Sequence, residues 1–126
     1  MFYHYHFNNY LFFYLKYNKN IKSEHMNDIF NEQLESDVNS ITLLYGGKRE
    51  KISSKRDINK FFKLMRNTKL IEFNTDNIIF WGMLLEINTN NTSIYMVCYD
   101  TKIVYNNRHY YIDKDCTNSI RKIFGK

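Results

Sequence analysis

Residues 54–67 carry the pattern that most restricts the fold of this chain, an amphipathic helix with an uninterrupted apolar stripe. Ser54 comes three residues before Asp57, and a hydroxyl followed at that distance by a carboxylate is close to a capping box. The i, i+3, i+4 and i+7 positions of a helix are then occupied by Ile58, Phe61, Phe62 and Met65. The pattern predicts a helix from Lys55 to about Asn67 whose apolar stripe faces a sheet, while Arg56, Lys60 and Lys63 form an outer stripe in solvent.

A tight hairpin is predicted just before this helix. Residues 41–45 are rich in β-prone side chains, Gly46 and Gly47 suit a two-residue turn, and residues 48–52 alternate as a solvent-facing return strand would. The Gly-Gly-Lys triplet lacks the spacing of a phosphate-binding loop. The sequence therefore indicates a strand turn here and no nucleotide site.

Four more strands are predicted after the helix. Ile78 to Leu85 is nearly continuously apolar, with Trp81 expected in the core; this run is typical either of a central strand covered on both faces or of a strand that continues past Gly82 with a bulge. Residues 93–99 form a second long strand, and residues 102–105 and 108–112 flank Asn106-Asn107, a pair that tolerates the positive φ of a two-residue turn.

A short last helix completes the predicted order. Asp113 or Asp115 can begin it, and Gly125 can end it. Its apolar face would be formed by Cys116, Ile120, Ile123 and Phe124. The order is hairpin, helix, four-stranded meander and C-terminal helix, which predicts an α+β two-layer domain with a mainly antiparallel sheet and its helices on one face.

The N-terminal part differs in composition from the rest. Nine of the first seventeen residues are Phe or Tyr, and residues 1–22 include no acidic residue. We expect an aromatic-rich extension over residues 1–25 and a single domain over 26–126, with translation starting at Met26, where Met26, Ile29, Phe30 and Leu34 recur at helical spacing. The alternatives are a degenerate export signal and an aromatic segment at a membrane interface. The apolar run here is too short to span a bilayer.

Positive charge is concentrated in one segment. Nine of the eighteen basic residues lie between Lys48 and Lys69, where the acidic residues are Glu50 and Asp57, so the segment has a net charge of +7 in a chain of net charge +5. Such a face indicates either an acidic partner or a solvated helix that provides solubility. The residues expected to converge into one partner-binding patch are Lys48, Arg49, Lys51, Lys55, Arg56, Lys60, Lys63 and Arg66.

No catalytic or metal motif stands out. A Cys-His-Asp grouping of Cys116, His109 and Asp113 or Asp115 can be imagined, but His109 is typical of a half-exposed sheet histidine and Cys116 of a protonated core thiol. Cys98 is also expected in the core. His4 and His6 lack a third ligand for a metal. We therefore expect a protein that is not an enzyme and holds no metal or small-molecule cofactor.

Two functional hypotheses follow. The first is a non-catalytic interaction module that presents its basic helix to an acidic protein surface or an anionic polymer, at the cell envelope or as a mobile-element accessory protein that inhibits a host factor. The second is a nucleic-acid-binding protein that uses the same basic patch with tyrosines as stacking surfaces. Lysine outnumbers arginine in the patch and no nucleic-acid motif is present, which favours the first hypothesis.

Residues 41–124, about two-thirds of the chain, resemble small uncharacterised domains of low-GC Gram-positive bacteria that are often tethered as lipoproteins. The resemblance rests on the opening hairpin, the helix from Lys55 to Asn67 and the run from Ile103 to Asp113. It implies the fold and an extracytoplasmic setting, with no known activity. The chain lacks a recognisable signal and a lipid-accepting cysteine, so the sequence by itself predicts a cytoplasmic location.

Overall fold

The computed structural model describes residues 23–73, 82–99 and 101–125. The expectations for residues 1–22 and for Trp81 lie outside these ranges. The bounds of the elements, in chain order, are β1 Ser23–His25, α2 Met26–Ile29, α3 Glu32–Asp37, β2 Val38–Tyr45, β3 Lys48–Ile52, α4 Lys55–Arg66, β4 Lys69–Phe73, β5 Met83–Thr89, β6 Ser93–Tyr99, β7 Lys102–Tyr105, β8 Arg108–Ile112 and α5 Thr117–Gly125.

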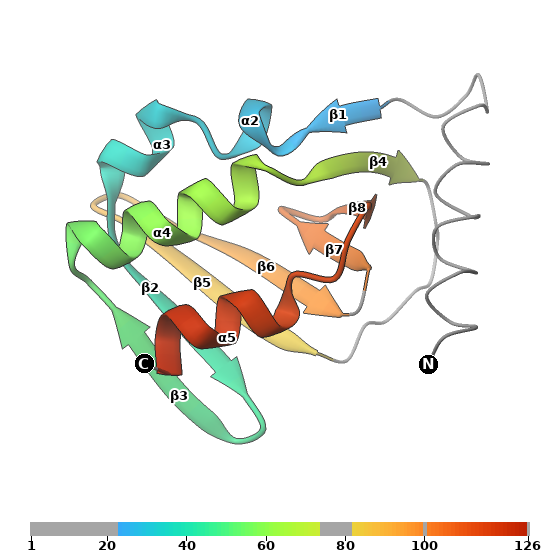
Figure 1. The fold of residues 1–126 in the computed structure, drawn as a ribbon. Helices are drawn as coiled ribbons and strands as arrows, with labels where there is room; N and C mark the ends of the chain where they lie inside the picture. Colours follow the sequence, from blue (N-terminus) through green and yellow to red (C-terminus); the bar gives the residue numbers. More distant parts are fainter. Residues whose placement is uncertain (1–22, 74–81, 100, 126) are drawn as a thin grey trace.

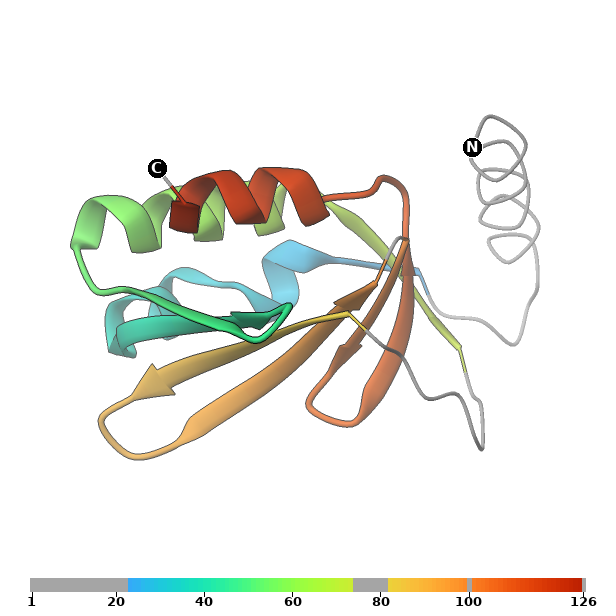
Figure 2. The same ribbon diagram turned by 90° about the horizontal axis from the view of Figure 1, so that it is seen from below.

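One antiparallel sheet and a layer of helices make up the fold. Within the described residues, the sheet has eight strands in the order β1-β4-β8-β7-β6-β5-β2-β3, and each neighbouring pair is antiparallel. Helices α4 and α5 lie on the same face of the sheet (Figures 1 and 2). The predicted α+β fold with a mainly antiparallel sheet is confirmed.

Helix α4 forms as its sequence predicts. The Ser54 side chain accepts a hydrogen bond of 3.1 Å from the Asp57 backbone N–H, which satisfies one of the free donors of the first turn. Its buried residues include Ile58, Phe61, Phe62 and Met65, the predicted apolar stripe. The helix ends at Arg66, one residue before its C-cap Asn67.

Both predicted two-residue turns are present. Gly46 and Gly47 have φ values of 59° and 77°, and Asn106 and Asn107 have φ values of 49° and 66°. Positive φ at both central residues gives a turn whose twist matches that of the flanking strands. These turns define the register of the β2–β3 and β7–β8 hairpins, in which Tyr45 pairs with Lys48 and Tyr105 pairs with Arg108.

The predicted meander β5–β6–β7–β8 is confirmed. One of the two alternatives for its first strand, a central strand covered on both faces, is not. Strand β5 lies between β2 and β6. Its residues Met83, Leu85 and Ile87 are buried in alternation with half-buried neighbours, so cover on both faces is wrong for the described part of this strand. Gly82 approaches β6 so closely that a Cβ atom there would lie 2.2 Å from the Cys98 carbonyl oxygen, and only glycine avoids that contact.

The sequence analysis did not predict β1, α2, α3 and β4 in the form that the structure has. Strand β4 pairs with β8 and with β1, so part of the expected extension, Ser23–His25, belongs to the sheet. The helical pattern that starts at Met26 is divided into α2 and α3. The division occurs because Asn31 leaves the helical conformation and its side-chain oxygen caps α3, accepting a hydrogen bond of 2.8 Å from the Leu34 N–H.

The last helix confirms one of the two expected start residues. The Asp115 carboxylate accepts a hydrogen bond of 2.9 Å from the Thr117 N–H. Asp113 instead accepts one of 3.2 Å from the Lys69 N–H, which ties this loop to β4. Ile120 and Phe124 of α5 are buried, and Cys116 is buried just before the helix begins. The helix therefore packs on the sheet through the predicted face.

Candidate functional site

The outer stripe of α4 lies in solvent as predicted. Arg56, Lys60 and Lys63 are exposed, and so is Lys55 at the start of the helix. The opposite side of α4 packs on the sheet, so the outer stripe points away from it. None of these four side chains forms an ion pair with a carboxylate of the described residues.

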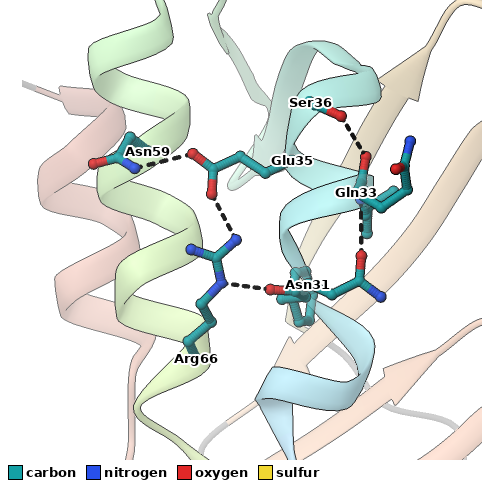
Figure 3. Close-up of polar contacts among 8 residues, drawn as sticks. Asn31, Gln33, Glu35, Ser36, Asn59 and Arg66 are labelled. Atoms are coloured by element: carbon teal, nitrogen blue, oxygen red, sulfur yellow. Dashed lines mark hydrogen bonds and ion pairs between the residues drawn. The ribbon is translucent and has the colours of Figure 1, made fainter.

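Arg66 has a structural role that the sequence analysis did not foresee. Its Nε donates a hydrogen bond of 2.6 Å to the Phe30 carbonyl, and its Nη2 lies 2.6 Å from Glu35 Oε1 of α3. The other Glu35 oxygen accepts a hydrogen bond of 2.9 Å from Asn59 of α4 (Figure 3). The guanidinium also lies over the Phe62 ring, 5.5 Å from its centroid. Arg66 thus fastens α3 to α4, and its charge is already paired.

We expect Arg66→Met to destabilise the fold. Methionine keeps the apolar stem but removes the donors that Arg66 supplies to Glu35 Oε1 and to the Phe30 carbonyl, so the free energy of unfolding should fall by about 2–3 kcal/mol. Urea unfolding followed by circular dichroism measures this. Lys63→Met, one turn earlier and exposed, is the matched control and should change stability by less than about 0.5 kcal/mol. Equal losses in the two variants would contradict the role of Arg66.

The hairpin residues do not join the α4 residues in one patch. Arg49 and Lys51 pair with Leu44 and Thr42, whereas Glu50 and Ile52 pair with the core residues Leu43 and Ile41. Because side chains alternate across a strand, Arg49 and Lys51 point to the open face of the sheet, away from the helices. Lys48 pairs with Tyr45 and lies on the helix side. The predicted single patch is therefore divided by the sheet.

Helix α5 supplies cations that the sequence analysis overlooked. Arg121 and Lys122 are exposed on α5, which contacts both α4 and β3. We call the exposed cations Arg56, Lys60 and Lys63 of α4 together with Arg121 and Lys122 of α5 the helix-layer surface. The exposure of Arg121 and Lys122 could have been predicted from the apolar face of the last helix, because both residues lie between its apolar positions. The sequence did not indicate that α5 lies beside α4.

An open groove lies between α5 and the β2–β3 hairpin. It has a volume of about 510 Å³, and we call it the α5 groove. The Arg121 guanidinium carbon lies 4.7 Å from the centroid of the Tyr45 ring, a cation–π contact. The polar and aromatic residues that line the groove include Tyr45, Lys48, Glu50, Asn118, Arg121 and Lys122. Three cations, Lys48, Arg121 and Lys122, line the groove with one carboxylate, Glu50, so the groove carries a net positive charge.

The imagined Cys-His-Asp grouping is not assembled. His109 pairs with Val104 and is half-buried, and its neighbour Tyr110 points to the core. The His109 side chain therefore lies on the face of the sheet opposite the core cluster, which it shares with the fully buried Ile71. Cys116 belongs to the core cluster on the helix side, and burial raises the pKa of its thiol from 9.0 to about 12. His109 lies on the other side of the sheet from the protonated Cys116 thiol, so its imidazole cannot act as the base that deprotonates this thiol.

Comparisons with known proteins gave no match to a family model, to a curated protein or to a solved structure. No helix within the described ranges is long and apolar enough to cross a membrane. In the same part of the chain, His, Cys, Asp and Glu side chains form no group of three or more that could hold a metal ion.

Proposed function

We propose that this protein is a non-catalytic interaction module that binds an acidic partner through its helix-layer surface. The observation that supports this is the outward projection, from two adjacent helices, of exposed cations that no described carboxylate neutralises. A surface of one sign attracts an oppositely charged partner and orients the encounter. The partner in this proposal is an acidic protein or anionic polymer of the cell envelope, or a host factor that a mobile-element protein inhibits.

A solvated helix that only provides solubility would show the same exposure, so the test must measure binding. Arg56→Glu/Lys60→Glu reverses two charges of the helix-layer surface, and Arg49→Glu/Lys51→Glu makes the same change on the open face of the sheet. Since all four side chains are exposed, both variants should keep the thermal midpoint. Matched net charge makes the second variant a control for long-range electrostatics.

We expect the α4 double variant to bind a fluorescent glutamate-rich peptide at least about tenfold more weakly than the wild type, and the sheet variant to lose no more than about threefold. Fluorescence anisotropy at low and moderate salt measures both affinities. Equal weakening in the two variants would mean that net charge alone attracts the peptide, and the proposed docking surface would then be wrong.

A second candidate, nucleic-acid binding, is favoured by the open face of the sheet. Tyr95 and Tyr99 of β6 are 53% and 51% exposed, and they point to the same side as Arg49 and Lys51 by the register of the sheet. Strands β5 and β2 separate these tyrosines from the two cations on β3, so a single-stranded nucleic acid would have to cross this face to stack its bases on the tyrosines and place its phosphates on Arg49 and Lys51. In this case a single-stranded oligonucleotide, and not the peptide, would be the tighter probe, and Arg49→Glu/Lys51→Glu would be the variant that loses it.

A further inference from the structure

Within the helix-layer surface, the α5 groove differs from the rest because its arginine is held in place. Arg121 lies over the Tyr45 ring, and Tyr45 projects from the last residue of β2, beside the turn that defines the β2–β3 register. The stacked guanidinium has fewer orientations open to it than the free lysines of α4, so less conformational entropy is lost when it binds. Within the described residues, its N–H groups donate no hydrogen bond and form no ion pair, so they are available to an acceptor from a partner.

We propose that the α5 groove binds a carboxylate side chain of an acidic segment in the partner, with Arg121 as the donor. This inference rests on the proposed function and names the part of the surface that recognises the partner. A planar carboxylate accepts two parallel N–H bonds from a guanidinium, the geometry that arginine offers and lysine does not. Lys48 and Lys122 line the same groove and add to its positive charge.

Two features favour an acidic peptide over a phosphate group. Glu50 lines the groove, and its negative charge opposes a doubly charged phosphate monoester more than a singly charged carboxylate. The Tyr45 ring, 39% exposed, offers apolar surface for the methylene groups of a glutamate stem. An acidic peptide meets both kinds of surface, whereas a phosphate has no apolar part to place on the ring.

The test measures the affinity of variants for the same glutamate-rich peptide. We expect Arg121→Gln to weaken binding about tenfold, and Arg49→Gln, which removes the same charge on the opposite face of the sheet, to weaken it no more than about threefold. Arg121→Lys should fall between them because it keeps the charge and loses the paired donors. Tyr45→Leu should weaken binding as well, whereas Tyr45→Phe, which keeps the ring under Arg121, should leave it unchanged.

The possible outcomes separate this inference from the function on which it rests. If the wild-type protein does not bind the peptide, both fail. If the wild type binds and the α4 double variant does not, but Arg121→Gln and Arg49→Gln behave alike, the proposed function stands and the groove is wrong. A single-stranded oligonucleotide of equal charge could instead bind more tightly than the peptide and displace it. If Arg121→Gln abolishes that displacement, the groove is a phosphate site and the peptide proposal is wrong.

Discussion

Phe30→Ala is expected to cost about 3–5 kcal/mol of unfolding free energy, the range for an aromatic side chain removed from a packed core. Phe30 is fully buried, and its ring meets those of Phe61 and Phe62 edge-on at 5.9 and 5.5 Å and the Tyr105 ring at 5.4 Å. It lies between α2 and α3, so one side chain joins the segment before the hairpin to α4 and β7. No small movement of three separate elements can refill its space.

The experiment compares Phe30→Ala with Tyr99→Ala in urea unfolding followed by circular dichroism. Tyr99 is 51% exposed on the open face of the sheet, so its truncation should cost less than about 0.5 kcal/mol. Phe30→Leu, which keeps most of the apolar volume, should lie between the two. A loss below about 1 kcal/mol for Phe30→Ala would mean that α2 and α3 are a loosely attached addition and that the stable domain begins at the hairpin.

The elements that the sequence predicted correctly are those whose signals are local. The cap and apolar stripe of α4 occupy fourteen consecutive positions from Ser54 to Asn67, and the Gly-Gly and Asn-Asn turns need only the residues beside them. A local signal is read within a window of a few turns, because the same residues that produce it also satisfy it. For this reason the hairpin, α4, the meander and α5 could be recognised before the structure was known.

The elements that the sequence did not predict depend on partners far away along the chain. Strand β4 has five residues and is held by pairing with β8 and β1, so its own short apolar run gave little sign of it. Phe30 was placed in a helical pattern, but its burial depends on α4 and β7. Tertiary contacts of this kind override local preference.

The candidate site was predicted only in part, for a related reason. The α4 cations could be assigned to solvent from helical periodicity alone, whereas the orientation of Arg49 and Lys51 depends on the register of β3 against β2, and a shift of one residue would have moved both to the helix side. Arg66 has the same spacing as the free cations, and it differs only because Glu35 and the Phe30 carbonyl lie opposite it. Charge clustering in a sequence therefore defines candidates, and pairing across the fold decides which of them remain available.

The second large effect concerns alkaline pH and the thiols of Cys98 and Cys116. Both side chains belong to the core cluster. Burial raises the pKa of each thiol above its ordinary value of 9.0, for Cys116 to about 12, and in both cases nearby Asp115 raises it further. Below pH 9 both thiols are protonated in the folded and the unfolded chain, so they add no pH dependence. Above it the unfolded chain releases protons that the folded chain keeps.

Stability should therefore fall by about 1.4 kcal/mol per pH unit for each thiol as the pH rises above the unfolded value. For Cys116 the fall continues until the pH reaches the folded pKa of about 12. Burial also raises the pKa of Tyr105 and Tyr111 from 10.0, so the measurement is made from pH 8.5, just below the ordinary thiol pKa of 9.0, to pH 10, the ordinary tyrosine pKa. Urea unfolding across this window gives the slope for the wild-type protein.

The decisive comparison is between slopes, because a cavity lowers stability equally at every pH while a titrating group changes how stability depends on it. Cys98→Ala/Cys116→Ala should be less stable than the wild type at pH 8.5 yet nearly independent of pH up to 10, since both titrating thiols are gone. Each single variant should keep about half of the wild-type slope. An unchanged slope in the double variant, or rapid reaction of either native thiol with a disulfide reagent near neutral pH, would show that these side chains reach water and that the helix layer does not seal the sheet beneath it.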